Sequence, residues 1–232
     1  MSKEKKTGIL VGASPLGAEV SLLKELLNNS DVISVAADGG LSFFVQESIR
    51  PDYWLGDRDS LPESLFEKAG LLFPDLELTP CAREKDDTDM RLAMLKCVEC
   101  KATEVYIFGG LGGDRFDHGI SNIQLLHEFA LQGVRVFLIS EKEYLYVLTK
   151  GEKVVYDQSS NGILSIFSLT DETSLSIRDL RYEFDGKINN RKVFTVSNEF
   201  NQKGGTVEVF EGTALIVRPV FYAEDRNRIS FL

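Results

Sequence analysis

The pattern of apolar residues changes near residue 140 and divides the chain into two kinds of structure. Before that point, strand-like apolar runs alternate with helical patterns, beginning with a strand over 8–11 and a helix over 16–27. Such alternation is typical of a mostly parallel sheet with helices on both faces. Beyond it, short runs rich in Val, Ile, Phe and Tyr are separated by turn residues, which is typical of an antiparallel sandwich. We therefore predict an α/β plus all-β fold, with a mostly parallel α/β domain over residues 1–141 and an antiparallel β-sandwich over residues 142–232.

The charge and cysteine content of the chain limit the kinds of partner and the cellular compartment that we expect for this protein. A formal net charge of -10 argues against a nucleic-acid binder that works through a basic face. No apolar stretch approaches the length of a membrane span. The odd count of three cysteines fits a reducing compartment, and Cys97 and Cys100 are better interpreted as packed helix residues than as a zinc or redox motif. We expect a cytoplasmic protein that binds neither nucleic acid nor membranes.

Acid-rich motifs follow the expected strands of the first domain. They are Asp38-Gly39-Gly40, Gly56-Asp57-Arg58-Asp59-Ser60, Lys85-Asp86-Asp87-Thr88-Asp89 and Gly112-Gly113-Asp114-Arg115-Phe116-Asp117-His118. Open α/β sheets bind ligands at the carboxyl ends of their strands, so these motifs are expected to converge. Carboxylates forced together raise one another's pKa values unless a divalent cation lies among them. Magnesium prefers oxygen ligands and accompanies nucleotide phosphates, so the motifs predict a magnesium and nucleotide site.

The second and third of these motifs each have a structural alternative. Asp57 and Asp59 can point to one side and reach one metal ion, or they can form an acidic turn that caps the next helix. At the start of a later helix, Asp86 or Asp87 can simply cap the helix. In the functional interpretation, Asp89 projects toward a metal or a substrate cation.

Two further motifs carry possible binding groups. Lys85 can contact phosphate, and the glycine-rich run 109–113 lies between an expected strand and an expected helix. Backbone N–H groups of glycines approach phosphate closely, and Arg115 adds a planar donor fork. The run matches neither G-x-G-x-x-G nor the P-loop, which disfavours a dehydrogenase or an ordinary P-loop kinase. A structural loop is the alternative here, as a turn is for the polar pair Ser197 and Asn198.

Taken in order, these motifs resemble those of the thiamine pyrophosphokinase family over nearly the whole chain. The resemblance implies an α/β nucleotide-binding domain, a β-sandwich, and a homodimer with active sites at the subunit interface. It also implies a magnesium-dependent enzyme that transfers the diphosphate group of ATP to thiamine and releases AMP.

The resemblance also implies roles for individual residues. The residues expected at the metal and the pyrophosphate are Asp57, Asp59 and Asp89, with Asp86 as a further contributor. The residues expected around the nucleotide and its phosphates are Asp38, Gly39, Gly40, Lys85, Gly112, Gly113 and Arg115. Asp117 is expected to help organise the catalytic site, and Ser197 and Asn198 to line the thiamine pocket.

The chain departs from the family pattern at two places. Arg58 stands where the family commonly has an aromatic residue, and it either contacts phosphate or faces solvent. Some members carry a tryptophan that stacks on thiamine in the strand equivalent to 213–217, where this chain has Leu215, Ile216 and Val217. Two rival functions stay open at this point: a diphosphokinase of the same fold acting on a hydroxymethyl pterin, and a non-catalytic ATP-sensing module.

Overall fold

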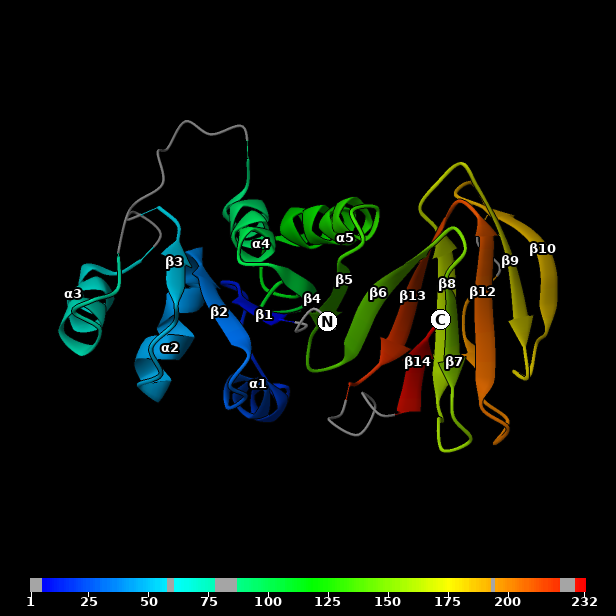
Figure 1. The fold of residues 1–232 in the computed structure, drawn as a ribbon, viewed down its shortest axis with the longest axis horizontal. Coiled ribbons are helices and arrows are strands. Elements are labelled where there is room, and N and C mark those ends of the chain that lie inside the picture. The colour runs from blue at the N-terminus through cyan, green and yellow to red at the C-terminus, as the bar shows by residue number, and fades with distance from the viewer. Residues whose placement is uncertain (1–5, 58–60, 78–86, 193–194, 222–227) are drawn as a thin grey trace, which may run out of the picture. The chain divides into compact units, whose positions relative to one another are not determined.

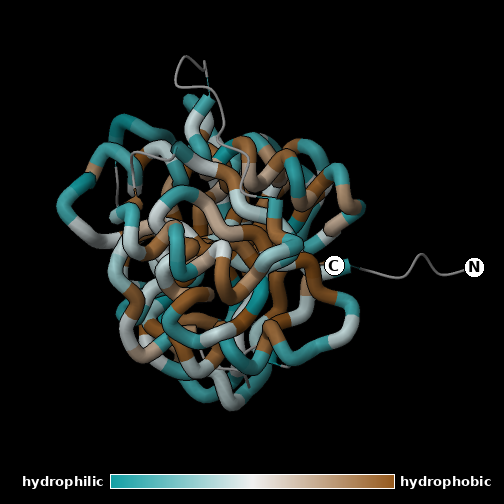
Figure 2. The backbone as a smooth tube through the Cα atoms, turned by 90° about the vertical axis from the view of Figure 1, so that its left-hand side faces the viewer, coloured by the Kyte–Doolittle hydropathy of each residue, from teal (hydrophilic) through white to brown (hydrophobic). Residues whose placement is uncertain are grey.

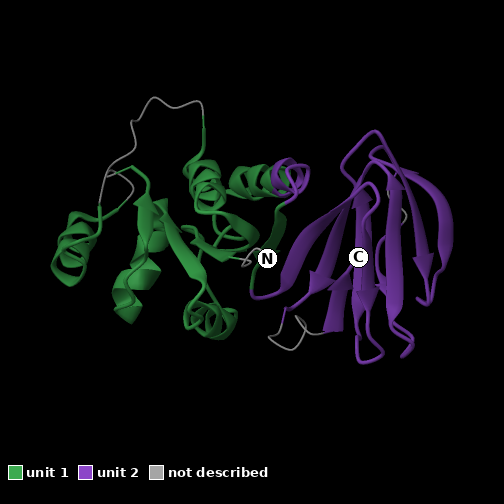
Figure 3. Cartoon of the chain, in the orientation of Figure 1, with its two compact units in different colours: residues 1–125, 134–140 green, residues 126–133, 141–232 purple. Residues whose placement is uncertain are grey.

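A computed structural model describes residues 6–57, 61–77, 87–192, 195–221 and 228–232. The chain forms two compact units, coloured separately in Figure 3. The first unit comprises residues 1–125 and 134–140, and the second comprises residues 126–133 and 141–232. The assignment of nucleotide binding to residues 1–141 and thiamine binding to residues 142–232 stays a prediction.

In its described part, the first unit contains one sheet of five parallel strands. Their spatial order is β3 (Tyr53–Leu55), β2 (Val32–Ala37), β1 (Lys6–Val11), β4 (Ala102–Phe108) and β5 (Arg135–Ile139). The order reverses between β1 and β4. The strands β2 and β3 that follow β1 lie on one side of it, and the strand β5 that follows β4 lies on the opposite side of the sheet. Sheets of this kind bind ligands at the point of reversal, beyond the carboxyl ends of the strands.

Helices cover both faces of this sheet. They are α1 (Val20–Leu27), the short 3-10 helix η1 (Asp38–Gly40), α2 (Leu41–Glu47), α3 (Glu63–Leu72), α4 (Asp89–Glu99) and α5 (Phe116–Ala130). In Figure 1, α4 and the start of α5 lie on one face, and α1 and α2 lie on the other. The central strands are apolar and fully buried at Ile9, Leu10 and Ile107, as expected for strands covered on both sides. Figure 2 shows hydrophobic segments, in brown, running through the interior.

In the part of it that the structure describes, the second unit contains two antiparallel sheets. One contains β11 (Asn198–Glu199), β8 (Ile163–Ser168), β13 (Thr213–Pro219) and β6 (Glu143–Thr149) in that spatial order. The other contains β10 (Phe184–Asn189), β9 (Glu172–Arg178), β12 (Gly205–Glu211), β7 (Lys153–Tyr156) and β14 (Ile229–Phe231).

Aromatic side chains join the two sheets of the second unit. The hydroxyl of Tyr146 on β6 is hydrogen-bonded to that of Tyr156 on β7, and the rings of Tyr146 and Phe231 pack edge to face at 5.4 Å. Arg218 of β13 is 5% exposed and lies 5.0 Å from the centre of the Tyr156 ring. The sheets therefore pack face to face, and the predicted fold class is confirmed.

The apolar pattern of the sequence also predicts a strand over 76–79, which falls mainly outside the described residues. The two described residues of this segment, Leu76 and Glu77, belong to no strand. Among the described residues, no helix combines the length and the apolar character needed to cross a membrane.

Candidate functional site

An open cleft lies at the point where the strand order of the first unit reverses. Its wall combines residues 12–14 after β1, 37–38 at the end of β2, 88–90 at the start of α4, Gly109 after β4, and His118, Ser121 and Asn122 of α5. The cavity measures about 90 Å³, well below the roughly 300–1,000 Å³ of pockets that enclose a drug-sized ligand. The described residues thus form a recess for a small group such as a phosphate, rather than an enclosure for a whole nucleotide.

Asp38 lines this cleft, and one of its carboxylate oxygens has no hydrogen-bond partner among the described residues. Its backbone is left-handed (φ 51°), and its carbonyl accepts a hydrogen bond from Trp54 Nε1 at 3.1 Å. Its Oδ1 is buried and has no hydrogen-bond partner among the described residues. An unsatisfied buried oxygen is costly, so this atom calls for a cation or a donor from a ligand.

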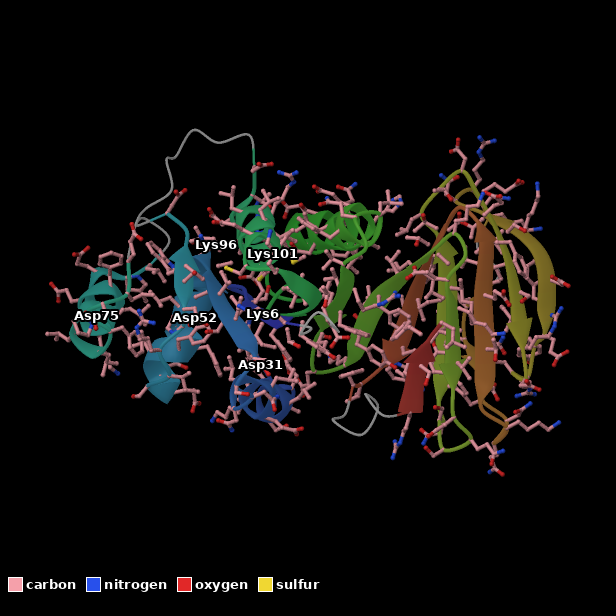
Figure 4. The ribbon with its side chains drawn as sticks, viewed as in Figure 1. Lys6, Asp31, Asp52, Asp75, Lys96 and Lys101 are labelled. Carbon is pink, nitrogen blue, oxygen red and sulfur yellow. The ribbon has the colours of Figure 1, made fainter. Side chains whose placement is uncertain are left out.

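Asp52, labelled in Figure 4, shows the opposite arrangement at the other end of the same strand pair. Its Oδ2 accepts hydrogen bonds from the backbone N–H of Ser34 at 2.8 Å and from the Ser34 hydroxyl at 2.9 Å. The Asp52 carboxylate therefore ties β2 to the start of β3, whereas one oxygen of the Asp38 carboxylate has no hydrogen-bond partner in the described part of the chain.

The predicted glycines after Asp38 serve a close backbone contact. A Cβ atom at Gly40 would lie 1.9 Å from the carbonyl oxygen of Val11, and one at Gly39 would lie 3.0 Å from Ala13 Cβ. The turn after β2 can approach the end of β1 only because residue 40 has no side chain.

Asp57 lies at the end of the neighbouring strand. In the pairing of β2 with β3, Ala37 is opposite Leu55, and a Cβ atom at Gly56 would lie 2.8 Å from Asp38 Cα. The backbones that carry Asp38 and Asp57 are therefore adjacent.

The expected partner Asp59 lies outside the described residues, as do Arg58, Lys85 and Asp86. Within the described part, no three acidic, His or Cys side chains form a group able to hold a metal. The predicted metal ligands Asp57, Asp59 and Asp89 thus stay a prediction as a set.

The start of α4 places Asp89 on the cleft. Thr88 is the N-cap residue, and its hydroxyl accepts a hydrogen bond from the backbone N–H of Arg91 at 3.2 Å. Asp87 forms an ion pair with Arg91 at 2.7 Å. Thr88 therefore caps this helix, and neither Asp87 nor Asp89 does so.

The glycine-rich run after β4 packs against the loop after β1. The N–H of Gly12 donates to the carbonyl of Phe108 at 2.7 Å, and the N–H of Ser14 donates to that of Gly109 at 3.0 Å. A Cβ atom at Gly109, whose φ is 62°, would lie 2.5 Å from the Gly12 carbonyl oxygen. The two backbones touch directly, and only glycine fits there.

Arg115 and Asp117 pair with each other. Arg115 donates from Nε to Oδ1 of Asp117 at 2.9 Å and from Nη2 to Oδ2 at 2.6 Å. These charge-assisted hydrogen bonds lower the pKa of Asp117 to about 2. Both side chains are about two-thirds exposed, at 65% and 64%, and neither lines the cleft. Asp117 is therefore ionised at neutral pH and a weak base.

Most wall residues were not predicted from the sequence as site residues, and Ser14, Asn122 and His118 are among them. The position of Ser14 after a strand-like run and a glycine is a sequence signal for such a site. Asn122 is a single polar residue on the apolar side of α5, and it is 5% exposed. His118, near the start of α5, also lines the cleft.

A second cavity, of about 280 Å³, lies in the second unit. Its lining residues are Ile177, Tyr182, Glu183, Phe184, Thr195, Val196 and Asn198. The side chain of buried Asn198 donates to the carbonyl of Tyr182 at 2.7 Å and accepts from its N–H at 3.0 Å. Ser197 has a left-handed backbone (φ 55°) and donates its N–H to Ser165 Oγ at 3.0 Å. Asn198 thus holds Tyr182, a residue that the sequence did not single out, at the rim of the cavity.

Comparison with known proteins gives one consistent family. Residues 23–138 match the family described as thiamin pyrophosphokinase, catalytic domain. A thiamine pyrophosphokinase from Bacillus subtilis is 25% identical over 206 residues, which are 87% of this chain and 95% of that protein.

Solved structures agree with this match. The thiamine pyrophosphokinase from Bacillus subtilis superposes with a TM-score of 0.82 at 23% identity, covering 94% of this chain and 100% of that chain. The enzyme from Geobacillus thermodenitrificans superposes with a TM-score of 0.79 at 28% identity, covering 94% and 99%.

Proposed function

The chain belongs to the thiamine pyrophosphokinase family, and from this premise we propose that it transfers the diphosphate group of ATP to the hydroxyl of thiamine, giving thiamine diphosphate and AMP. The observation that carries the proposal is the cleft at the reversal point of the sheet, where Asp38, Asp89 and the glycine-rich run meet. Such a recess, with acidic groups beside backbone donors, suits a metal-bound polyphosphate.

The residues present fit a magnesium ion. Carboxylate oxygens are its preferred protein ligands, and the buried Oδ1 of Asp38 has no hydrogen-bond partner among the described residues. We propose that Asp57, Asp59 and Asp89 hold the ion, with Asp38 beside them on the nucleotide side. When bound, the ion neutralises negative charge on the phosphate oxygens.

The protein's own task in the transfer is alignment and charge stabilisation. The thiamine hydroxyl oxygen forms a bond to the β-phosphorus of ATP, and the bond from that phosphorus to the oxygen of the α-phosphate breaks, so AMP leaves. We propose that Lys85 and Arg115 stabilise charge on the phosphate oxygens, and that Asp59 or Asp89 accepts the hydroxyl proton. Asp117 holds Arg115 through its two hydrogen bonds and organises it for this role.

The cavity of the second unit is our proposed thiamine pocket. Thiamine carries a thiazolium cation, which aromatic rings and carboxylates attract. Tyr182 and Phe184 supply rings and Glu183 supplies a carboxylate. The chain's single tryptophan is Trp54, so Tyr182, held by Asn198, is the candidate for the stacking surface. We propose a homodimer with active sites at the subunit interface, which the family resemblance supports.

The decisive experiment measures AMP release from magnesium-ATP with and without thiamine, and identifies the thiamine product by mass. Thiamine-dependent AMP release with matching thiamine diphosphate supports the proposal. AMP release that requires a hydroxymethyl pterin instead of thiamine would show that the acceptor substrate is a pterin. Tight ATP binding with no AMP release under either condition would favour the ATP-sensing module.

A further inference from the structure

We infer that Asn122 is a positioning residue that orients the glycine-rich run 109–113 so that its backbone N–H groups face the phosphates of the nucleotide. The inference rests on the proposed ATP site and assigns a role to a residue that the sequence analysis did not select.

The carbonyl groups of the run are engaged by the protein. Asn122 Nδ2 donates to the carbonyl of Gly110 at 2.7 Å, and this bond is buried. Ser14 engages two more carbonyls, donating from its N–H to Gly109 at 3.0 Å and from Oγ to Gly112 at 3.1 Å. A carbonyl oxygen that faced a phosphate would repel it, and these three are held by donors instead.

The backbone N–H groups of the same run differ from its carbonyl groups in their hydrogen bonding. Within the described part of the chain, the backbone N–H groups of residues 110–113 donate no hydrogen bond. Gly109, Gly112 and Gly113 have positive φ values of 62°, 79° and 75°. Successive backbone N–H groups in such a turn form a concave site for anions, as in other phosphate-binding loops.

Asn122 is the buried member of the pair that fixes this loop. The acceptor at Gly110 determines which end of the amide faces the loop, because only Nδ2 can donate. Gly110 itself is tightly packed, since a Cβ atom there would lie 2.7 Å from Leu138 Cδ1 and 3.3 Å from Asn122 Nδ2. Asn122 also lines the cleft, so we expect a substitution at this position to affect the site through the glycine-rich run 109–113.

The test compares dissociation constants of ATP, inorganic tripolyphosphate and adenosine for the wild-type protein and four variants, one of them a control. Asn122→Ala removes the donor, and Asn122→Asp keeps the shape but places an acceptor against the Gly110 carbonyl. Ser14→Ala removes the second side-chain donor from the other side of the loop. Gln124→Ala, an exposed amide on the same helix, is the matched control.

We expect the dissociation constants of ATP and tripolyphosphate to rise about five- to tenfold in Asn122→Ala, the factor that one lost hydrogen bond allows, and more in Asn122→Asp. Ser14→Ala should act in the same direction, and adenosine binding and the Gln124→Ala variant should be unchanged. A merely structural role would weaken adenosine as much as ATP. Equal losses for both ligands, or wild-type ATP affinity in a folded Asn122→Asp variant, would overturn the inference.

The two proposals fail separately in this experiment. A wild-type protein that binds neither ATP nor tripolyphosphate contradicts the proposed function. A wild-type protein that binds both, with unchanged Asn122 variants, contradicts only the role of Asn122.

Discussion

The indole Nε1 of Trp54 donates a hydrogen bond to the backbone carbonyl of Asp38 at 3.1 Å. The donor lies on β3 and the acceptor at the turn after β2, so this bond fixes the turn that carries the unsatisfied carboxylate. Trp54 is 2% exposed and is the only tryptophan of the chain. Its side chain therefore couples the fold of the first unit to the geometry of the proposed nucleotide site.

Replacing Trp54 with Phe should weaken both stability and ATP binding. The substitution removes one buried hydrogen bond and part of a packed ring, so the free energy of unfolding should fall by roughly 1–3 kcal/mol. Denaturant titration followed by circular dichroism measures this loss, and calorimetry measures ATP affinity. In the wild-type protein, magnesium-ATP should change the fluorescence of Trp54. An ATP titration that binds with no fluorescence change would show that the ligand does not reach the Asp38 turn.

Asp38→Asn should separate binding from stability. Asparagine tolerates the left-handed backbone, and it removes the charge that we propose faces the metal-bound nucleotide. We expect magnesium-ATP affinity to fall about tenfold or more, while the free energy of unfolding stays the same or rises.

Asp52→Ala is the matched test of a structural carboxylate. It removes the acceptor of two Ser34 hydrogen bonds, so the free energy of unfolding should fall by about 1–2 kcal/mol with ATP affinity retained. The distinction between a ligand-binding Asp38 and a structural Asp52 fails if Asp38→Asn and Asp52→Ala each lose both stability and ATP affinity.

Arg115→Gln should return the pKa of Asp117 from about 2 toward the ordinary value near 3.9, because the guanidinium hydrogen bonds that lower it disappear. In the wild-type protein, the stabilisation from this pair is present above pH about 4 and is lost as the pH falls toward about 2. Carboxyl titration by NMR measures both values. An unchanged pKa in the variant would show that the pair does not form in solution.

The second unit should lose stability at alkaline pH. Burial raises the pKa of Tyr156 to about 12 and also raises the pKa of Tyr146 well above its ordinary value. Because unfolded tyrosines lose their protons near pH 10, the stabilisation is complete below that pH and is lost progressively as the pH rises toward about 12. Unfolding curves across this range, with phenolate absorbance recorded in parallel, measure the effect. If both phenols ionise near pH 10 while the fold persists, the buried cluster is wrongly described.

The fold class followed from the sequence because the strand and helix periods are properties of local segments. The approach of Asp38 to Asp57 followed from the same logic, since both end neighbouring parallel strands. The bond from Asn122 to Gly110 did not follow, because one polar residue in an amphipathic helix gives no sign of what it faces. Likewise, the hydrogen-bonded pairing of Arg115 with Asp117 depends on side-chain rotamers that the motif does not specify.

Two glycines that line the cleft, Gly12 and Gly109, and a third beside it, Gly40, stand where a side chain is sterically excluded. A Cβ atom would lie 2.6 Å from the Gly109 carbonyl oxygen at Gly12, 2.5 Å from the Gly12 carbonyl oxygen at Gly109, and 1.9 Å from that of Val11 at Gly40. Substitutions can therefore change the other residues that line this recess, but they cannot add a side chain at these three glycines unless the backbone moves. We expect directed evolution toward new acceptors to change the proposed thiamine pocket beside Tyr182, while the proposed polyphosphate site stays the same.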